Sequence, residues 1–273
     1  MKNPNNPVSD DPIAARKWLR WLPTGMPAHR ALVTDLMWLH HTMPTVSQVK
    51  TFDLRELRTV RDACPRRISW AVAFLRAYAL AAVEFPSLRR TYLSWPWPHL
   101  YEHPETVGNL VVSRNSGDER WLFFAPITSA ENGLLDQQQG LLERYQSGPP
   151  EEVFKNQVRL AYYPFYIRRL LWWMRFHFSP RKRIKRLGTF ALTTVAGQGV
   201  TILDPRAPVT STLTYGPLND AGECDVTIAY DHRVMDGKEV ADILCATERI
   251  MQTRIVREFH DLAQQHRSRA VAA

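Results

Sequence analysis

The stretch AYDHRVMDGKEV, residues 229–240, joins a β-rich run to a segment whose apolar residues have helical spacing. His232 stands at this junction, and imidazole is the side chain whose ordinary pKa lies near neutrality, so it can accept and return a proton at cellular pH. Gly237 would permit a tight turn into the helix. Spacing alone leaves two interpretations open, a proton-transfer group and a structural histidine at a strand end. The charged neighbours that could pair and fix the loop are Asp231, Arg233 and Asp236.

The rest of the chain alternates segments of two periodicities, which predicts a mixed α and β fold. Pro164 interrupts one long helical run, so a kink or a break is expected there. Expected strands span 45–54, 107–114, 119–127, 189–195, 211–218 and 224–232, and expected helices span 29–41, 68–85, 131–146, 153–178 and 237–262. Residues 91–105 and 147–152 are expected to be loops. Because the strands cluster late, a two-layer α/β sandwich is expected, with helices packed on one face of a mixed sheet.

Two of the expected helices have a clear apolar face, which predicts the residues that they bury. The first contributes Leu32, Leu36 and Leu39, and the last contributes Val240, Ile243, Leu244, Ile250 and Met251.

The chain of 273 residues is expected to fold as one domain, because no Gly/Ser-rich linker divides it. We assign residues 1–25 to a flexible arm, 26–265 to the domain and 266–273 to a polar tail. No run reaches about 18 uninterrupted apolar residues, so no spanning helix is expected. The cysteines lack the spacing of a metal site and indicate reduced thiols in a cytoplasmic protein; they are Cys64, Cys224 and Cys245.

The formal net charge of +8 is unevenly distributed. Residues 153–203 contain ten Lys or Arg and no Asp or Glu. Such a segment favours an anionic partner: a phosphorylated cofactor, an acidic lipid surface or nucleic acid. Nucleic acid is not expected, because no recognised nucleic-acid-binding module accompanies the charge.

The segment DHRVMDG at 231–237 resembles the signature of the acyltransferase catalytic domain of 2-oxo acid dehydrogenase complexes, a family related to chloramphenicol acetyltransferase. Further segments resemble the same family in the same order over residues 30 to about 262. They are HRALVTDLM at 29–37, MPTVSQVKTFDLRELRTVR at 43–61, FLRAYALAAVEFPSL at 74–88, VGNLVVSR at 107–114, FFAPI at 123–127, GTFALTTVAGQGV at 188–200 and APVTSTLTYGPL at 207–218. The resemblance implies a chloramphenicol-acetyltransferase-like fold and acyl transfer from a thioester.

The resemblance also implies residue roles. His232 matches the general base that deprotonates the acceptor thiol, and Thr193 matches the hydroxyl that hydrogen-bonds the tetrahedral oxyanion. Asp236 matches an acidic position that pairs with an arginine near the N-terminus, here Arg30, in order to hold the loop. Asp231 and Arg233 are expected to have similar structural duties.

The family forms trimers with the active site between subunits, so His232 and Thr193 would come from different chains of a homotrimer. Coenzyme A or another acyl thioester would be the substrate, and no metal, redox cofactor or covalent lipoyl group is implied. Only 29 residues precede Arg30, so a separate carrier or coenzyme A is expected to supply the acyl group. The alternative is a non-catalytic trimeric scaffold, or a lipid- or acyl-binding protein, that retains the fold.

The segment 160–188 departs from the family pattern. Its apolar helical face predicts packing inside the domain or at a trimer interface and comprises Ile167, Leu170, Leu171, Met174 and Phe178. Trp172, Trp173 and Phe176 lie on the remaining circumference with three arginines, a pattern that fits a helix lying on an anionic membrane or the mouth of a channel for a long acyl chain. The basic run that follows is interpreted either as phosphate contacts for coenzyme A or as a solvated face; it contains Arg181, Lys182, Arg183 and Lys185.

Two other groups are interpreted without a catalytic role. His40 and His41 are expected to be polar or packing residues, and Cys224 and Cys245 small core residues.

Overall fold

The computed structural model describes residues 26–116 and 119–272. The arm predicted for residues 1–25 lies outside the described residues.

The centre of the fold is a six-stranded mixed sheet with the strand order β1-β8-β7-β6-β4-β5. β6 pairs in parallel with both β4 and β7, whereas the other neighbouring strands are antiparallel. The strands are β1 (Thr45–Asp53), β4 (Val107–Ser116), β5 (Glu119–Thr128), β6 (Phe190–Thr193), β7 (Ser211–Tyr215) and β8 (Glu223–Asp231). All six strands expected from the sequence are therefore present, and the mixed α/β fold is confirmed.

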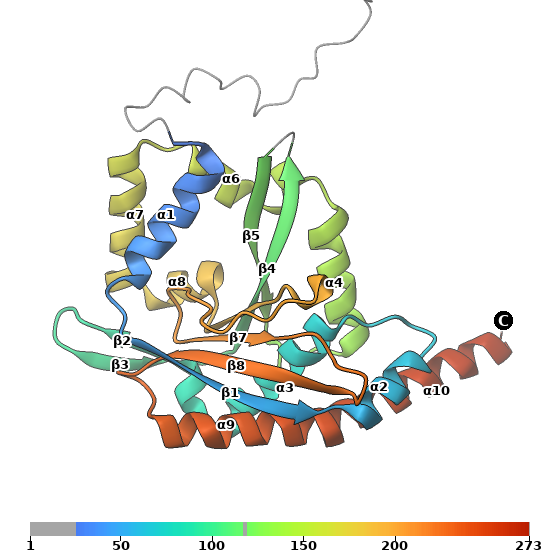
Figure 1. The fold of residues 1–273 in the computed structure, drawn as a ribbon. Coiled ribbons are helices and arrows are strands. Elements are labelled where there is room, and N and C mark those ends of the chain that lie inside the picture. Colours follow the sequence, from blue (N-terminus) through green and yellow to red (C-terminus); the bar gives the residue numbers. More distant parts are fainter. Residues whose placement is uncertain (1–25, 117–118, 273) are drawn as a thin grey trace, which may run out of the picture.

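Helices α3 (Trp70–Glu84) and α9 (Gly237–Ile250) pack on one face of this sheet (Figure 1). The composition of α3 explains its position, since a helix that is apolar nearly all round must be buried. The ring of Phe74 stacks on Tyr215 at 4.3 Å between centroids, and the Tyr78 hydroxyl lies 3.0 Å from Ser211 Oγ. These contacts join α3 to β7 at the centre of the sheet.

The last helical run is longer than one regular helix. α9 continues through a π-helical turn (Met251–Ile255) into α10 (Val256–Ala272). The five apolar residues predicted for its buried face are all less than 5 % exposed. The segment assigned as a polar tail, 266–273, continues α10 as far as Ala272.

A second group of helices gathers at the β4–β5 edge of the sheet (Figure 1). It consists of α1 (Ala28–His40), α6 (Lys155–Ala161), α7 (Phe165–Phe178) and α8 (Pro180–Leu187). Pro164 is the N-cap of α7, so the break expected at this proline is confirmed. Gly188 ends α8 at φ +81, where an added Cβ would lie 2.7 Å from two backbone oxygens. Only glycine therefore turns the chain from α8 into β6 without strain. We call α1, α6, α7 and α8 the helical group.

Shorter elements complete the fold. α2 (Arg55–Asp62) follows β1, α4 (Leu135–Ser147) packs against α3, and α5 (Pro150–Val153) occupies part of the segment expected to be a loop. A 3-10 turn (Pro86–Arg89) leads into a two-stranded sheet of β2 (Arg90–Leu93) and β3 (His99–Glu102). This hairpin corrects the ordered loop expected for 91–105: the prolines of WPWP lie in its turn, and the flanking residues are free to pair.

Candidate active site

His232 lies in the turn between β8 and α9, with an exposed side chain. Its backbone N–H donates to the Pro44 carbonyl at 2.9 Å, and its ring lies 5.8 Å from that of Tyr230. Within the described residues no side chain or backbone group hydrogen-bonds to the imidazole. Both ring nitrogens are therefore open to a substrate.

An ion pair between Asp231 and Arg233 fixes the turn that carries this histidine. The Asp231 carboxylate is 1 % exposed and accepts from Arg233 Nε at 2.9 Å and from Nη2 at 2.7 Å. The same carboxylate accepts from the Arg233 backbone N–H at 3.1 Å. The guanidinium also lies 4.2 Å from the centre of the Tyr92 ring, so the hairpin supports the turn from outside. Bidentate, charge-assisted contacts of this kind strongly restrict the conformation of the turn between Asp231 and Arg233.

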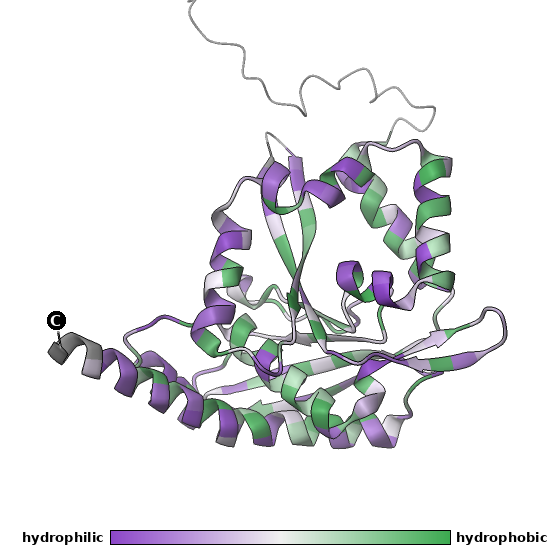
Figure 2. Cartoon of the chain, turned by 180° about the vertical axis from the view of Figure 1, so that it is seen from behind, coloured by the Kyte–Doolittle hydropathy of each residue, from purple (hydrophilic) through white to green (hydrophobic). Residues whose placement is uncertain are grey.

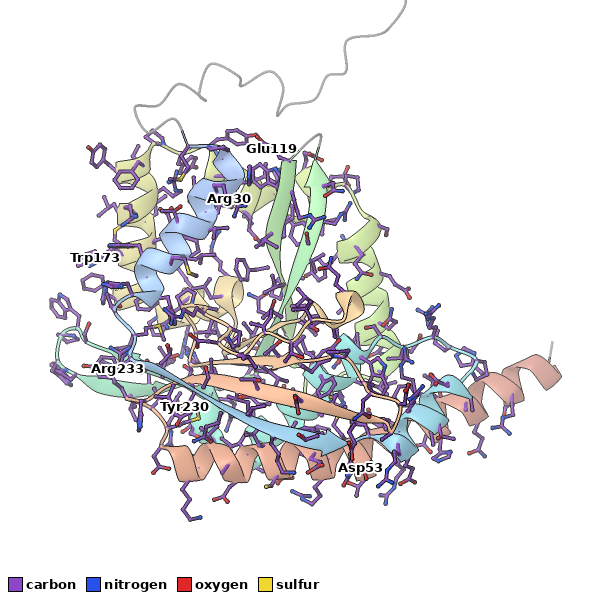
Figure 3. All side chains as sticks on the ribbon, in the orientation of Figure 1. Arg30, Asp53, Glu119, Trp173, Tyr230 and Arg233 are labelled. Atoms are coloured by element: carbon purple, nitrogen blue, oxygen red, sulfur yellow. The ribbon has the colours of Figure 1, made fainter. Side chains whose placement is uncertain are left out.

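Asp236 caps a helix in the structure and does not pair with Arg30. Its side chain accepts from the Glu239 backbone N–H at 2.9 Å, which satisfies one free donor at the start of α9. Arg30 lies far from this point, on the first turns of α1 (Figure 3), and no ion pair joins the two among the described residues. The expected Arg30–Asp236 contact is therefore absent within one chain. Gly237 opens α9, and a Cβ there would lie 2.8 Å from Gln48 Nε2, the far end of a flexible side chain that can move aside.

Thr193 lies at the end of β6 with a partly exposed side chain. Its hydroxyl has no hydrogen-bond partner among the described residues, whereas the neighbouring Thr194 Oγ1 donates to the Tyr215 carbonyl at 2.9 Å. A hydroxyl without a partner can donate a hydrogen bond to an oxygen atom of a bound molecule.

Strand register places Thr193 and His232 at opposite ends of the sheet. Thr193 pairs with Thr214, which pairs with Thr227, and His232 is five residues further along the chain than Thr227. At ~3.3 Å per residue along the strands and ~4.8 Å between them, the two residues are roughly 19 Å apart. One chain cannot bring both residues to the same carbonyl carbon.

The basic residues suggested for coenzyme A do not form one surface. Arg183 is buried, donates to the Pro208 carbonyl at 3.2 Å and lies 3.7 Å from the centre of the Phe176 ring. Burial lowers its pKa to about 9, and the charge of Asp231 opposes this shift. Arg183 is thus a structural cation beneath the His232 turn. Arg181, Lys182 and Lys185 are exposed.

The orientation of α7 is the reverse of the one expected for packing inside the domain. Its buried side chains are Arg168, Trp172 and Phe176. The side chains expected to be buried, Ile167, Leu170, Met174 and Phe178, are between 39 % and 55 % exposed; only Leu171 packs against the core. Figure 3 shows the neighbouring Trp173 pointing away from the fold.

The cause is an ion pair that was not foreseen from the sequence. Asp35 on α1 is fully buried and accepts from Arg168 Nε and, at 3.1 Å, from Arg169 Nε. The position of Asp35 could have indicated a buried ion pair, because Asp35 falls on the same helical face as Leu32, Leu36 and Leu39. An acid on a buried face requires a cationic partner.

Two buried histidines also have structural surroundings. His40 Nδ1 lies 3.1 Å from the Ala207 carbonyl, and burial lowers the pKa of the ring. His103 Nε2 lies 3.1 Å from Thr91 Oγ1; burial, assisted by the charge of Arg183, lowers its pKa to about 4. His40 is a packing residue, as expected.

The cysteines are free thiols: Cys64 and Cys224 are buried, whereas Cys245, expected in the core, is exposed. Within residues 26–116 and 119–272 no cluster of His, Cys, Asp or Glu is arranged to hold a metal ion. Over the same described part, none of the helices is both long and apolar enough to span a membrane.

Comparison with known proteins identifies the fold. No family model matches the chain, and no curated protein matches its sequence. A dihydrolipoamide acetyltransferase from Azotobacter vinelandii is 16 % identical with a TM-score of 0.62, and the match covers 85 % of this chain and 92 % of that one. A probable dihydrolipoamide acetyltransferase from Listeria monocytogenes is 16 % identical with a TM-score of 0.59, over 82 % and 90 % of the two chains. A chloramphenicol acetyltransferase is 11 % identical with a TM-score of 0.51, over 80 % and 94 %. The chain has the chloramphenicol-acetyltransferase-like fold of acyltransferase catalytic domains, which confirms the resemblance seen in the sequence.

Proposed function

We propose that the protein is an acyltransferase that moves an acyl group from a thioester, such as acyl-coenzyme A, to an acceptor, with a site shared between subunits of a homotrimer. The observation that carries the proposal is the pair of open groups described above. His232 presents an imidazole without an internal partner on a rigid turn, and Thr193 presents an unpaired hydroxyl. The separation of the two within one chain requires a neighbouring subunit to complete the site.

The chemistry assigns both proton transfers to His232 and a hydrogen bond to the developing oxyanion to Thr193. His232 removes the proton from the acceptor, whose thiol, hydroxyl or amine then attacks the thioester carbonyl carbon. The carbonyl oxygen becomes negative and accepts a hydrogen bond from Thr193. The tetrahedral intermediate collapses, the carbon–sulfur bond breaks, and the leaving thiolate takes the proton back from the imidazolium. A positioned general base contributes about 10²–10⁴-fold in rate, and one oxyanion donor about 10²–10³-fold.

Thiol release from a panel of short and long acyl thioesters, with several acceptors, tests the proposal. His232→Ala should reduce release by about 10²–10⁴-fold without loss of stability, because the side chain is exposed. The matched control is His41→Ala, which removes a second exposed histidine. If release by His232→Ala equals that of the unaltered protein, the catalytic proposal fails and a non-catalytic acyl-binding protein with this fold is left.

We further propose that the exposed side of α7 contacts an anionic membrane from the outside. Tyr166, Ile167, Leu170 and Trp173 are between 39 % and 82 % exposed, and Trp95 and Trp97 of the hairpin are 48 % and 67 % exposed. Trp95 lies 5.3 Å from Phe178, which joins the two groups into one apolar surface. Figure 2 shows hydrophobic bands along α7 and a largely hydrophilic α8 beside it. Aromatic and aliphatic side chains next to cations, without acids in residues 153–203, match an anionic lipid surface.

Flotation with phosphatidylglycerol vesicles at low salt tests this contact. The unaltered protein should float with the vesicles, and Leu170→Ser combined with Trp173→Ser should not. Val83→Ser is the control, because Val83 is 58 % exposed on α3. No flotation by the unaltered protein, or dissociation of its oligomer by the paired change, would contradict the membrane contact; the latter would assign the surface to the subunit interface.

A further inference from the structure

A cavity of about 430 Å³ lies within the helical group, against β5. Its volume is within the range of small-molecule sites. Apolar side chains line it, among them Leu32 and Leu36 of α1, Phe124 of β5, Leu160 of α6, Trp172 of α7 and Leu187 of α8. This wall suits a hydrocarbon chain.

The same cavity is bordered by cations. Lys155, Arg175, Lys182, Lys185 and Arg186 line it, and Glu152 is the single acid among the lining residues. None of these five cations has an ion-pair partner within the described part of the chain, whereas Arg168 and Arg169 of the same helical group pair with Asp35. Burial and the charge of Arg186 lower the pKa of Arg175, which reflects a site with too few anions. Such a rim attracts an anionic group.

Two buried donors in the cavity wall lack acceptors. Trp172 is 7 % exposed and its indole N–H has no partner, and Arg175 Nη1 is buried without one. Buried donors are satisfied in the great majority of cases, so each unpaired donor needs an explanation. An oxygen-rich head group held by the cations would supply the missing acceptors.

We infer that this cavity binds an amphiphile with one apolar chain and an anionic head, either a carboxylate or a phosphate. The chain lies against Leu36, Phe124 and Leu187, and the head lies among Arg175, Lys182 and Lys185. The site is independent of the proposed acyl transfer, since neither His232 nor Thr193 lines it. α8 nevertheless contacts both regions of the fold. Lys182 and Lys185 of this helix line the cavity, whereas Arg183 donates to the Pro208 carbonyl in the loop that precedes β7.

Calorimetric titration with decanoate, decyl phosphate and decanol, each below its micelle concentration, tests the inference. One or both anions should bind, and decanol, which carries the same chain, should bind at least about tenfold more weakly, since contacts with a charged group are the stronger ones. Tighter binding of decyl phosphate indicates a phosphate head, and tighter binding of decanoate indicates a fatty acid. Failure of both anions to bind, or decanol binding as tightly as the better anion, overturns the inference.

Variants place the ligand in this cavity. Lys182→Glu combined with Lys185→Glu should weaken anion binding by about 10- to 100-fold, and Trp172→Phe, which removes only the indole N–H, by about fivefold. Arg181→Glu is the control, because Arg181 is exposed on the same helix but does not line the cavity. Equal weakening by the control and the paired change would overturn the assignment. His232→Ala should bind each anion as tightly as the unaltered protein does. A failed binding test therefore contradicts this inference alone, and a failed thiol-release assay contradicts the proposed acyl transfer alone.

Discussion

The β8–α9 junction and the helical group follow different rules of packing. At the junction, local patterns determine which side chains are buried: β8 is buried throughout residues 226–231, Asp236 caps the helix, and Val240 and Ile243 enter the core. In the helical group, α7 exposes its apolar stripe and buries Arg168. The difference shows that an apolar stripe predicts burial only when the surface that it meets is also apolar.

Magnitudes explain why α7 takes the orientation it does. Exposing four apolar side chains of α7 forgoes about 1.5–3 kcal/mol for each of them, but the same orientation buries Trp172 and Phe176, which offsets much of that loss. Leaving a buried carboxylate without a cation costs about 3–5 kcal/mol or more. Because Asp35 lies on the buried face of α1, the rotation of α7 that brings Arg168 and Arg169 to it is the more favourable one.

The largest expected effect on stability tests this explanation. Asp35→Asn removes the charge between Arg168 and Arg169 and leaves a buried guanidinium without an anion. The free energy of unfolding, measured in urea, should fall by about 3–5 kcal/mol. The change should also separate α7 from α1, which hydrogen exchange would report as lost protection in both helices.

A double variant separates the ion pair from simple packing. Asp35→Leu with Arg168→Met replaces both charges by apolar groups, and Arg169 is exposed enough to reach solvent. This protein should recover most of the stability lost in Asp35→Asn. A double variant as unstable as the single one would show that the ion pair does not determine the orientation of α7.

A smaller effect concerns His103, which lies close to Arg183 of the helical group. Burial and that cation lower its pKa from 6.5 to about 4. The folded protein therefore keeps the ring neutral, while the unfolded chain binds a proton below about pH 6.5. The neutral ring therefore contributes fully to the free energy of unfolding above about pH 6.5, and this contribution should fall by about 3 kcal/mol as the pH approaches 4. His40, whose pKa is also lowered, adds to the loss in the same direction.

Thermal unfolding between these two pH values measures the effect. The unfolding temperature of the unaltered protein should fall more steeply on acidification than that of His103→Gln. His41→Gln, at an exposed histidine, should keep the original slope. Equal slopes for the unaltered protein and His103→Gln would contradict the assigned pKa.

The smallest expected effect tests whether Asp236 acts as the N-cap of α9 and not as the ion-pair partner of Arg30. Asp236→Ala should lower the free energy of unfolding by about 1 kcal/mol through loss of the helix cap. Arg30→Ala should have almost no effect, and the two changes should be additive in a double-mutant cycle. A measurable coupling energy would instead show that Arg30 and Asp236 interact as the resemblance implied, either within the chain or between subunits.

Sequence reasoning predicted the sheet, the long helices and the break at Pro164, because each depends on local periodicity or on one residue type. It also identified the turn that carries His232. It failed where pairing over a long distance decides the outcome. The burial of Arg168 depends on Asp35, 133 positions away, and the burial of Arg183 depends on Pro208 and Phe176. The cavity against β5 unites segments from six helices and one strand, and no spacing in the sequence marks it.

The central claim is that His232 of one subunit acts with Thr193 of another, and complementation tests it most directly. His232→Ala and Thr193→Val chains are each assayed alone, then dissociated together, mixed in equal amounts and allowed to reassociate. Each variant alone should be nearly inactive. The mixture should regain about one quarter of the unaltered activity, because random assembly joins an intact His232 to an intact Thr193 at that fraction of the interfaces between subunits. A mixture no more active than its components, with exchange of chains confirmed by mass, would contradict a site shared between subunits.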